Sequence, residues 1–84
     1  MELGQIRMFA AVAQTGSFTK AAKLLFVSHS TVSRAVSSLE EELGQRLIER
    51  SNAVIGLTVA GERLLPKVCE ILKLADEIAS PSEN

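Results

Sequence analysis

Short hydrogen-bonding side chains crowd one stretch of this sequence, V-S-H-S-T-V-S-R-A-V-S-S, residues 27–38. If the stretch is a helix, one face is apolar and the other carries Ser28, His29, Ser30, Thr31, Ser33, Arg34, Ser37 and Ser38. Such a helix fits the major groove of DNA, where hydroxyls bond phosphates and base edges and an arginine can donate two hydrogen bonds to guanine. The pattern therefore favours contact with nucleic acid over a serine-rich solvated face, because serine is a mediocre helix former.

Catalysis and metal binding have weaker support in the residues. His29 stands between two serines, but adjacent residues on a helix point apart, and neither a nearby carboxylate nor a glycine-rich oxyanion loop accompanies them. Glu40, Glu41 and Glu42 would fan out over most of a helical turn, which predicts a solvated helix end and no acid–base or metal cluster. The one cysteine, Cys69, excludes an internal disulfide and is expected to be a small apolar residue of a helix. We expect no catalytic residues, no metal and no cofactor.

Charge divides the chain in two. The net charge of −1 would by itself oppose DNA binding, but residues 1–39 hold four basic residues and one acidic residue, giving 4 − 1 = +3. Residues 40–84 hold five basic and nine acidic residues, giving 5 − 9 = −4. We therefore expect the two halves to face different partners.

The elements that position these residues are three helices in succession. Apolar spacing predicts helices over residues 3–14, 17–25 and 28–43, with Ser17 and Ser28 as N-caps of the second and third and glycines after the first and third. The last two helices and their tight turn match a helix-turn-helix, with Leu43 at the end of the buried side of the third helix. On packing alone, the alternative of a helical hairpin without affinity for DNA stays open.

A small hairpin and a long helix are expected to follow. Residues 47–50 and 54–58 predict short strands joined by the polar turn Ser51–Ala53. Thr58 can cap a fourth helix over residues 59–79, with Pro66 bending it or marking an irregularity. Its apolar stripe is broader than one small domain covers, which predicts dimerisation. The stripe residues are Leu64, Leu65, Val68, Ile71, Leu72, Ala75 and Ile78.

Four motifs together resemble the N-terminal DNA-binding domain of LysR-type transcriptional regulators. They are G-S-F-T-K-A-A (16–22), L-x-V-S-x-S-T-V-S-R (25–34), L-E-E-E-L-G-x-R-L-I-E-R (39–50) and L-T-x-A-G-E (57–62). The resemblance implies a mainly α winged helix-turn-helix that binds double-stranded DNA and forms a homodimer through its long C-terminal helix. It also implies that a small-molecule effector acts only through a C-terminal domain outside this chain.

By this resemblance, the DNA-facing positions include Ser28, His29, Ser30, Thr31, Ser33 and Arg34, with Thr19 and Lys20 near phosphates. The family commonly writes Ser-Gln-Pro-Ala or Ser-Gln-Ser-Ala at residues 28–31, so His29 and Ser30 predict a different base preference, since histidine cannot copy the paired bonds of glutamine on adenine. The wing lacks the arginines usual in the family, which leaves Arg50 and Asn52 as its candidates for DNA contact.

Residues 1–58 are thus expected to form the winged helix-turn-helix domain, 59–79 a linker and dimerisation helix, and 80–84 a flexible tail. Neither a membrane-spanning run nor a signal segment is visible, so we expect a cytoplasmic location and no membrane partner. The alternative is a winged-helix protein-interaction module with weak or no DNA binding that works through the fourth helix.

Overall fold

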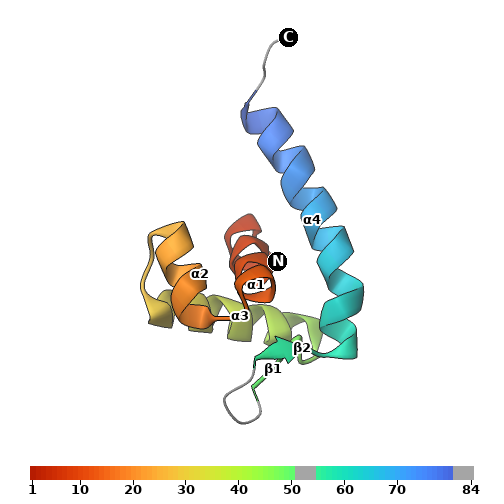
Figure 1. Ribbon diagram of the computed structural model, residues 1–84. Coiled ribbons are helices and arrows are strands. Elements are labelled where there is room, and N and C mark those ends of the chain that lie inside the picture. Colours follow the sequence, from red (N-terminus) through yellow and green to blue (C-terminus); the bar gives the residue numbers. More distant parts are fainter. Residues whose placement is uncertain (51–54, 81–84) are drawn as a thin grey trace.

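Four helices and one small hairpin make up the described part of the chain. The computed structural model describes residues 1–50 and 55–80. In order, the elements are α1 (Leu3–Thr15), α2 (Phe18–Leu25), α3 (His29–Leu43), β1 (Ile48–Glu49), β2 (Gly56–Leu57) and α4 (Val59–Ala79). Figure 1 shows α3 crossing beneath α1, with the hairpin at the same end of the molecule and α4 rising away from it. The predicted winged helix-turn-helix with a long last helix is confirmed.

The helix boundaries follow from local capping. Ser17, Ser28 and Thr58 each accept a hydrogen bond from the backbone N–H three residues later, at 3.0–3.1 Å. A side-chain oxygen in this position satisfies an N–H that has no partner within the helix, and it typically stabilises the helix by about 1 kcal/mol. At the other end of α3, Gly44 adopts a left-handed conformation with φ of 68°, which glycine tolerates without steric cost.

The core lies where α1 crosses α2, α3 and α4. Ala21 and Ala22 are buried and small, so α2 can approach its neighbours closely. The largest fully buried side chains come mainly from α1 and α3, and they are Ile6, Phe9, Val12, Val32, Val36, Leu39, Leu47 and Val68. The expectation that Leu43 is buried is wrong: it is 36% exposed, because it lines an open groove with Leu47 and Leu64 that nothing in the described residues fills.

The hairpin pairs two very short antiparallel strands. Ile48 lies opposite Leu57, and Glu49 lies opposite Gly56. The N–H of Thr58 donates to the carbonyl of Leu47 at 3.0 Å, which ties the start of α4 to the residue before β1. The predicted hairpin is confirmed, while its predicted turn at residues 51–53 lies outside the described residues.

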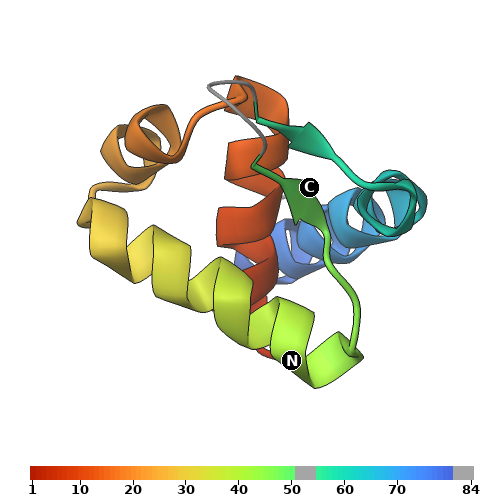
Figure 2. The ribbon, with the colours of Figure 1, turned by 90° about the horizontal axis from the view of Figure 1, so that it is seen from below.

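The start of α4 packs closely on the hairpin. Gly61 is buried there, and a Cβ atom at this position would collide with the backbone carbonyl oxygen of Leu47. The helix then continues as one element through Pro66 to Ala79. Figure 2, seen from below, shows α3 and the hairpin on the near side of the molecule, with α4 running behind. This arrangement leaves the outer face of α3 and the hairpin together on one surface.

Candidate nucleic-acid interface

The outer face of α3 is open to solvent along much of its length. Ser30, Arg34 and Ser37 are exposed, and their spacing of four and three residues places them on one side of the helix. Val32 and Val36 lie on the opposite side, with no exposed surface. The exposed face therefore consists of short hydroxyl side chains around one guanidinium group, which suits entry into a major groove.

Some hydroxyl groups at the start of α3 are occupied by contacts that cap the helix. The hydroxyl oxygen of Ser28 accepts the N–H of Thr31 at 3.1 Å and lies 2.7 Å from the hydroxyl of Thr31 and 3.2 Å from that of Ser30. Ser33 and Thr31 are only partly exposed, whereas His29 is exposed. Among the predicted contact residues of this turn, His29 and Ser30 thus present the most accessible polar groups.

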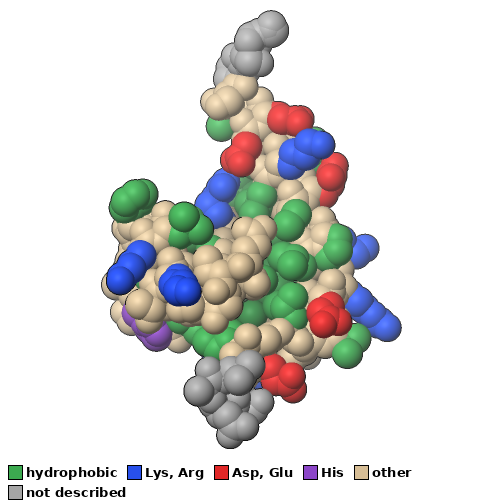
Figure 3. Space-filling view, viewed as in Figure 1, with side chains coloured by type: hydrophobic (Ala, Val, Ile, Leu, Met, Phe, Trp, Pro, Cys, Tyr) green, Lys and Arg blue, Asp and Glu red, His purple; other side chains and the backbone are tan. Residues whose placement is uncertain are grey.

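A second group of predicted contact residues lies at the start of α2. Thr19 and Lys20 are both exposed in the first turn of that helix. Figure 3 shows basic and no acidic side chains over α2 on the face in view, whereas basic and acidic side chains mix along α4. Lys20 and Lys23 of α2 therefore form a small basic surface next to the start of α3, where phosphate groups would be attracted.

Arg50 lies at the base of the wing and is held on two sides. Its guanidinium carbon is 4.9 Å from the centre of the Phe18 ring, and its Nη2 is 4.0 Å from Oε1 of Glu40. About one third of its side chain is still exposed. The structure thus brings Arg50 close to α2 and α3, where the sequence placed it only in the wing.

Glu40 has a structural role that the sequence analysis missed. It is 6% exposed, and its Oε2 accepts hydrogen bonds from the backbone N–H groups of Leu47 and Ile48 at 2.8 and 3.0 Å. Arg46 lies 3.6 Å from its other oxygen. The expected solvated end of α3 is therefore wrong for Glu40, although Glu41 and Glu42 are exposed. The sequence held one signal for the burial of Glu40: it stands four residues after Val36, on the same side of the helix as that buried residue.

The predicted stripe on α4 is divided between two faces. Val68 has no exposed surface because it belongs to the core, so its assignment to a partner-facing stripe is wrong. Leu64, Leu65 and Leu72 pack partly against the same core, and Ala75 is half-buried. In contrast, the large apolar side chains that remain exposed on α4 are Val59, Ile71, Leu74 and Ile78.

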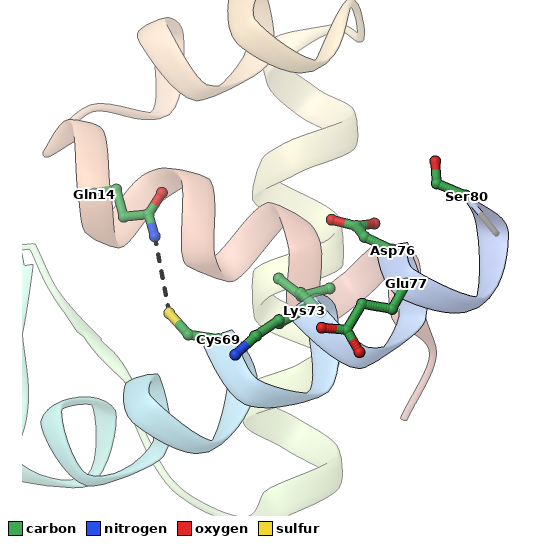
Figure 4. Close-up of a pocket in the computed structure, with 7 residues that line it drawn as sticks. Gln14, Cys69, Lys73, Asp76, Glu77 and Ser80 are labelled. Carbon is green, nitrogen blue, oxygen red and sulfur yellow. Dashed lines mark hydrogen bonds between the residues drawn. The ribbon is translucent and has the colours of Figure 1, made fainter. Parts of the chain in front are cut away.

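An open groove lies between α1 and the second half of α4. Figure 4 shows Gln14 from α1 facing Cys69 from α4, with its amide donating to the sulfur at 3.9 Å. Lys73, Asp76 and Glu77 line the same groove, and Cys69 is exposed. Within residues 1–50 and 55–80, histidine, cysteine and acidic side chains nowhere gather in threes as they would to hold a metal ion.

Across the described ranges, the helices are too short or too polar to pass through a membrane.

These elements define the class of the protein. Two helices joined by a tight turn, the second with an exposed polar face, precede a two-stranded wing, and this is a winged helix-turn-helix domain. The chain belongs to the lysR family of bacterial regulatory helix-turn-helix proteins, whose model matches residues 3–62.

Among curated relatives, the HTH-type transcriptional regulator YofA of Bacillus subtilis (strain 168) is 46% identical over 77 residues, covering 92% of this chain and 27% of the relative. The regulator BudR of Klebsiella aerogenes is 43% identical, covering 90% of this chain and 53% of the relative. This chain therefore spans only part of the length of these regulators.

Solved structures agree with this assignment. The BenM DBD/catB site 1 DNA complex is 38% identical with a TM-score of 0.89, covering 95% of this chain and 89% of that one. The CbnR DBD–DNA complex is 41% identical with a TM-score of 0.88, covering 96% and 93%. Corynebacterium glutamicum OxyR, in its oxidized form, is 38% identical with a TM-score of 0.93, covering 99% of this chain and 27% of that one.

Proposed function

We propose that this chain binds double-stranded DNA in a sequence-specific manner and regulates transcription, with α3 in the major groove. The observation that carries the proposal is the exposed face of Ser30, Arg34 and Ser37 on α3, opposite a fully buried face. Similar DNA-binding domains have been solved as DNA complexes at 38% and 41% identity, which supports the same use of α3 here. Residues 1–58 would form the DNA-contacting unit and α4 the linker.

The alternative, a protein-interaction module without DNA affinity, is less favoured. It would leave the basic surface of α2 and the exposed arginine of α3 without a role. The regulatory proposal assigns no catalytic step to the chain, and contact with the chromosome would place the protein in the cytoplasm. Any response to a small molecule would require a further domain, since the chain spans 24–58% of the first curated relatives.

Selection of bound sites from random double-stranded DNA tests the proposal. We expect a common motif to be enriched, and the affinity for it to fall steeply as salt rises, because Lys and Arg release counterions from the phosphates. Lys20 and Arg34 are the exposed residues whose removal should reduce the slope of that dependence. Recovery of unrelated sequences from repeated selections would refute sequence-specific binding.

Homodimerisation through α4 is the second part of the proposal. Ile71, Leu74 and Ile78 are 36%, 49% and 81% exposed, and their spacing of three and four residues places them on one side of the helix. A helix pair would bury this apolar surface, and it would hold two α3 helices about 34–36 Å apart, one turn of DNA.

Sedimentation measurements on the Leu74→Glu variant test the dimer. A charge at the centre of the exposed stripe should shift the chain toward monomer. Lys73→Glu, which also introduces a glutamate at an exposed position of α4 but lies away from this stripe, serves as the control for altered charge. An unchanged dimer in the Leu74→Glu variant would exclude this side of α4 as the interface.

A further inference from the structure

The ring of Phe18 contacts two side chains, those of His29 and Arg50, that are predicted from the sequence to contact DNA. Its centroid lies 5.8 Å from that of the His29 ring, with the two planes at 46°. The guanidinium carbon of Arg50 lies 4.9 Å from the same centroid. Phe18 is the first residue of α2, His29 is the first residue of α3, and Arg50 follows β1. One buried ring therefore joins three elements of the fold.

The position of Phe18 is itself well determined. It is 7% exposed and belongs to the core, and the residue before it, Ser17, caps α2. His29 likewise follows the capping residue of its own helix, Ser28. Because both backbones are fixed at helix starts, the contact between the two rings restricts the side-chain rotation of His29, which is otherwise exposed.

Arg50 is restricted by a second contact. Its Nη2 lies 4.0 Å from Oε1 of Glu40, and Glu40 is itself buried and bonded to the backbone of Leu47 and Ile48. A guanidinium over an aromatic ring is attracted by the negative face of the ring, and more strongly where water is partly excluded. The arginine thus keeps about a third of its side chain exposed while the rest is held in place.

We propose that Phe18 is a positioning residue for DNA recognition: its ring holds the His29 imidazole and the Arg50 guanidinium in fixed relative positions, so that the start of α3 and the base of the wing act as one surface. This inference rests on the proposed function. Histidine offers one hydrogen bond to a base edge, whereas an amide offers two, so its base preference depends more on a fixed direction. Ordering a free side chain on binding lowers affinity by about three- to tenfold.

Two matched phenylalanine variants test the proposal. Phe18→Leu keeps an apolar side chain but removes the aromatic face, while Phe9→Leu makes the same change in the fully buried core away from α3's outer face. Site selection and affinity are measured for both, with folding checked by circular dichroism. Phe18→Leu should weaken binding to the selected site by about three- to tenfold. It should also flatten the base preference at the position that His29→Ala affects, and Phe9→Leu should leave that preference intact.

A double variant separates positioning from a general loss of structure. If Phe18 acts through His29, Phe18→Leu should cause no further loss of base preference at that position in the His29→Ala background. A further loss of the same size in both backgrounds would overturn the coupling between the two rings.

A pair of arginine variants decides the case where Phe18→Leu does not fold. Arg46 and Arg50 both lie near Oε1 of Glu40, at 3.6 and 4.0 Å, but the cation–π contact with Phe18 belongs to Arg50. Arg50→Lys keeps the charge and removes the planar group, so it should weaken specific binding by about threefold or more. Arg46→Lys should not.

Failure of the inference differs from failure of the proposed function. If the unmodified chain enriches no DNA motif, the proposed function fails. If the unmodified chain enriches a motif, while Phe18→Leu matches Phe9→Leu and Arg50→Lys matches Arg46→Lys, the positioning role alone is refuted.

Discussion

Replacing the buried carboxylate of Glu40 should destabilise the fold measurably. Its Oε2 accepts two backbone N–H groups from the segment that enters β1, at 2.8 and 3.0 Å, and its side chain is 6% exposed. A hydrogen bond to a charged group contributes about 1.5–3 kcal/mol, and a buried donor without a partner costs about 1–3 kcal/mol. Glu40→Ala removes the acceptor for both donors at once, so we expect it to lower the free energy of unfolding by about 3–5 kcal/mol.

Glu40→Gln is the more informative change because it keeps the shape and one acceptor oxygen. It loses the charge that attracts Arg46 and Arg50, both of which are partly exposed, so it should cost about 1–2 kcal/mol. Glu41→Gln, one residue further on the exposed side, is the matched control and should stay within about 0.5 kcal/mol of the unmodified chain.

Urea unfolding followed by circular dichroism measures these differences, at one fixed protein concentration because a dimer is stabilised by mass action. Equal stability of Glu40→Gln and Glu41→Gln would refute the reasoning, since it would mean that the charged contacts of Glu40 contribute nothing.

Three further changes should separate backbone, turn and interface effects. Gly61→Ala should destabilise by about 1–3 kcal/mol in urea unfolding because its Cβ collides with the Leu47 carbonyl, whereas Gly4→Ala, with open space around it, should stabilise α1 by about 0.5–1 kcal/mol. Phe26→Asn should raise the free energy of unfolding by about 0.5–1 kcal/mol, since Phe26 is 94% exposed and has a φ of 59°, a conformation that asparagine tolerates better; a decrease in thermal stability would contradict this. Arg34→Ala should weaken DNA binding by about 1–3 kcal/mol and relax base preference at one position, while Arg63→Ala on α4 should leave the preference unchanged; an unaltered motif for Arg34→Ala would refute the base contact.

Helix positions were predictable from the sequence because their signals are local. Capping hydroxyls at Ser17, Ser28 and Thr58 and the glycine after α3 act within a few residues, and all four adopt the expected geometry. The helix-turn-helix pairing was also predictable, because small residues at the crossing and apolar spacing leave few ways to pack two short helices.

Contacts between distant segments were not predictable in the same way. The role of Glu40 depends on the backbone of residues 47–48 turning back onto α3, and the sequence shows only three adjacent glutamates. The contacts of Phe18 with His29 and Arg50 likewise require three elements to meet. An apolar residue such as Phe18, which the sequence pattern places in the core, can also contact side chains predicted to bind DNA. These contacts are visible only in the tertiary structure.

The long last helix shows a different limit of sequence patterns. A stripe of apolar residues reports how much of a helix is buried, but it does not say by what. On α4 the residues in contact with the core include Val68, Leu64 and Leu72, while Leu74 and Ile78 extend the apolar surface to an adjacent, exposed side. The first of these sides is therefore already buried within the chain. The second carries large apolar side chains of which about half or more of the surface is exposed. A proposed dimer has to use this second face, because separating α4 from α1 would expose Val68 and open the core.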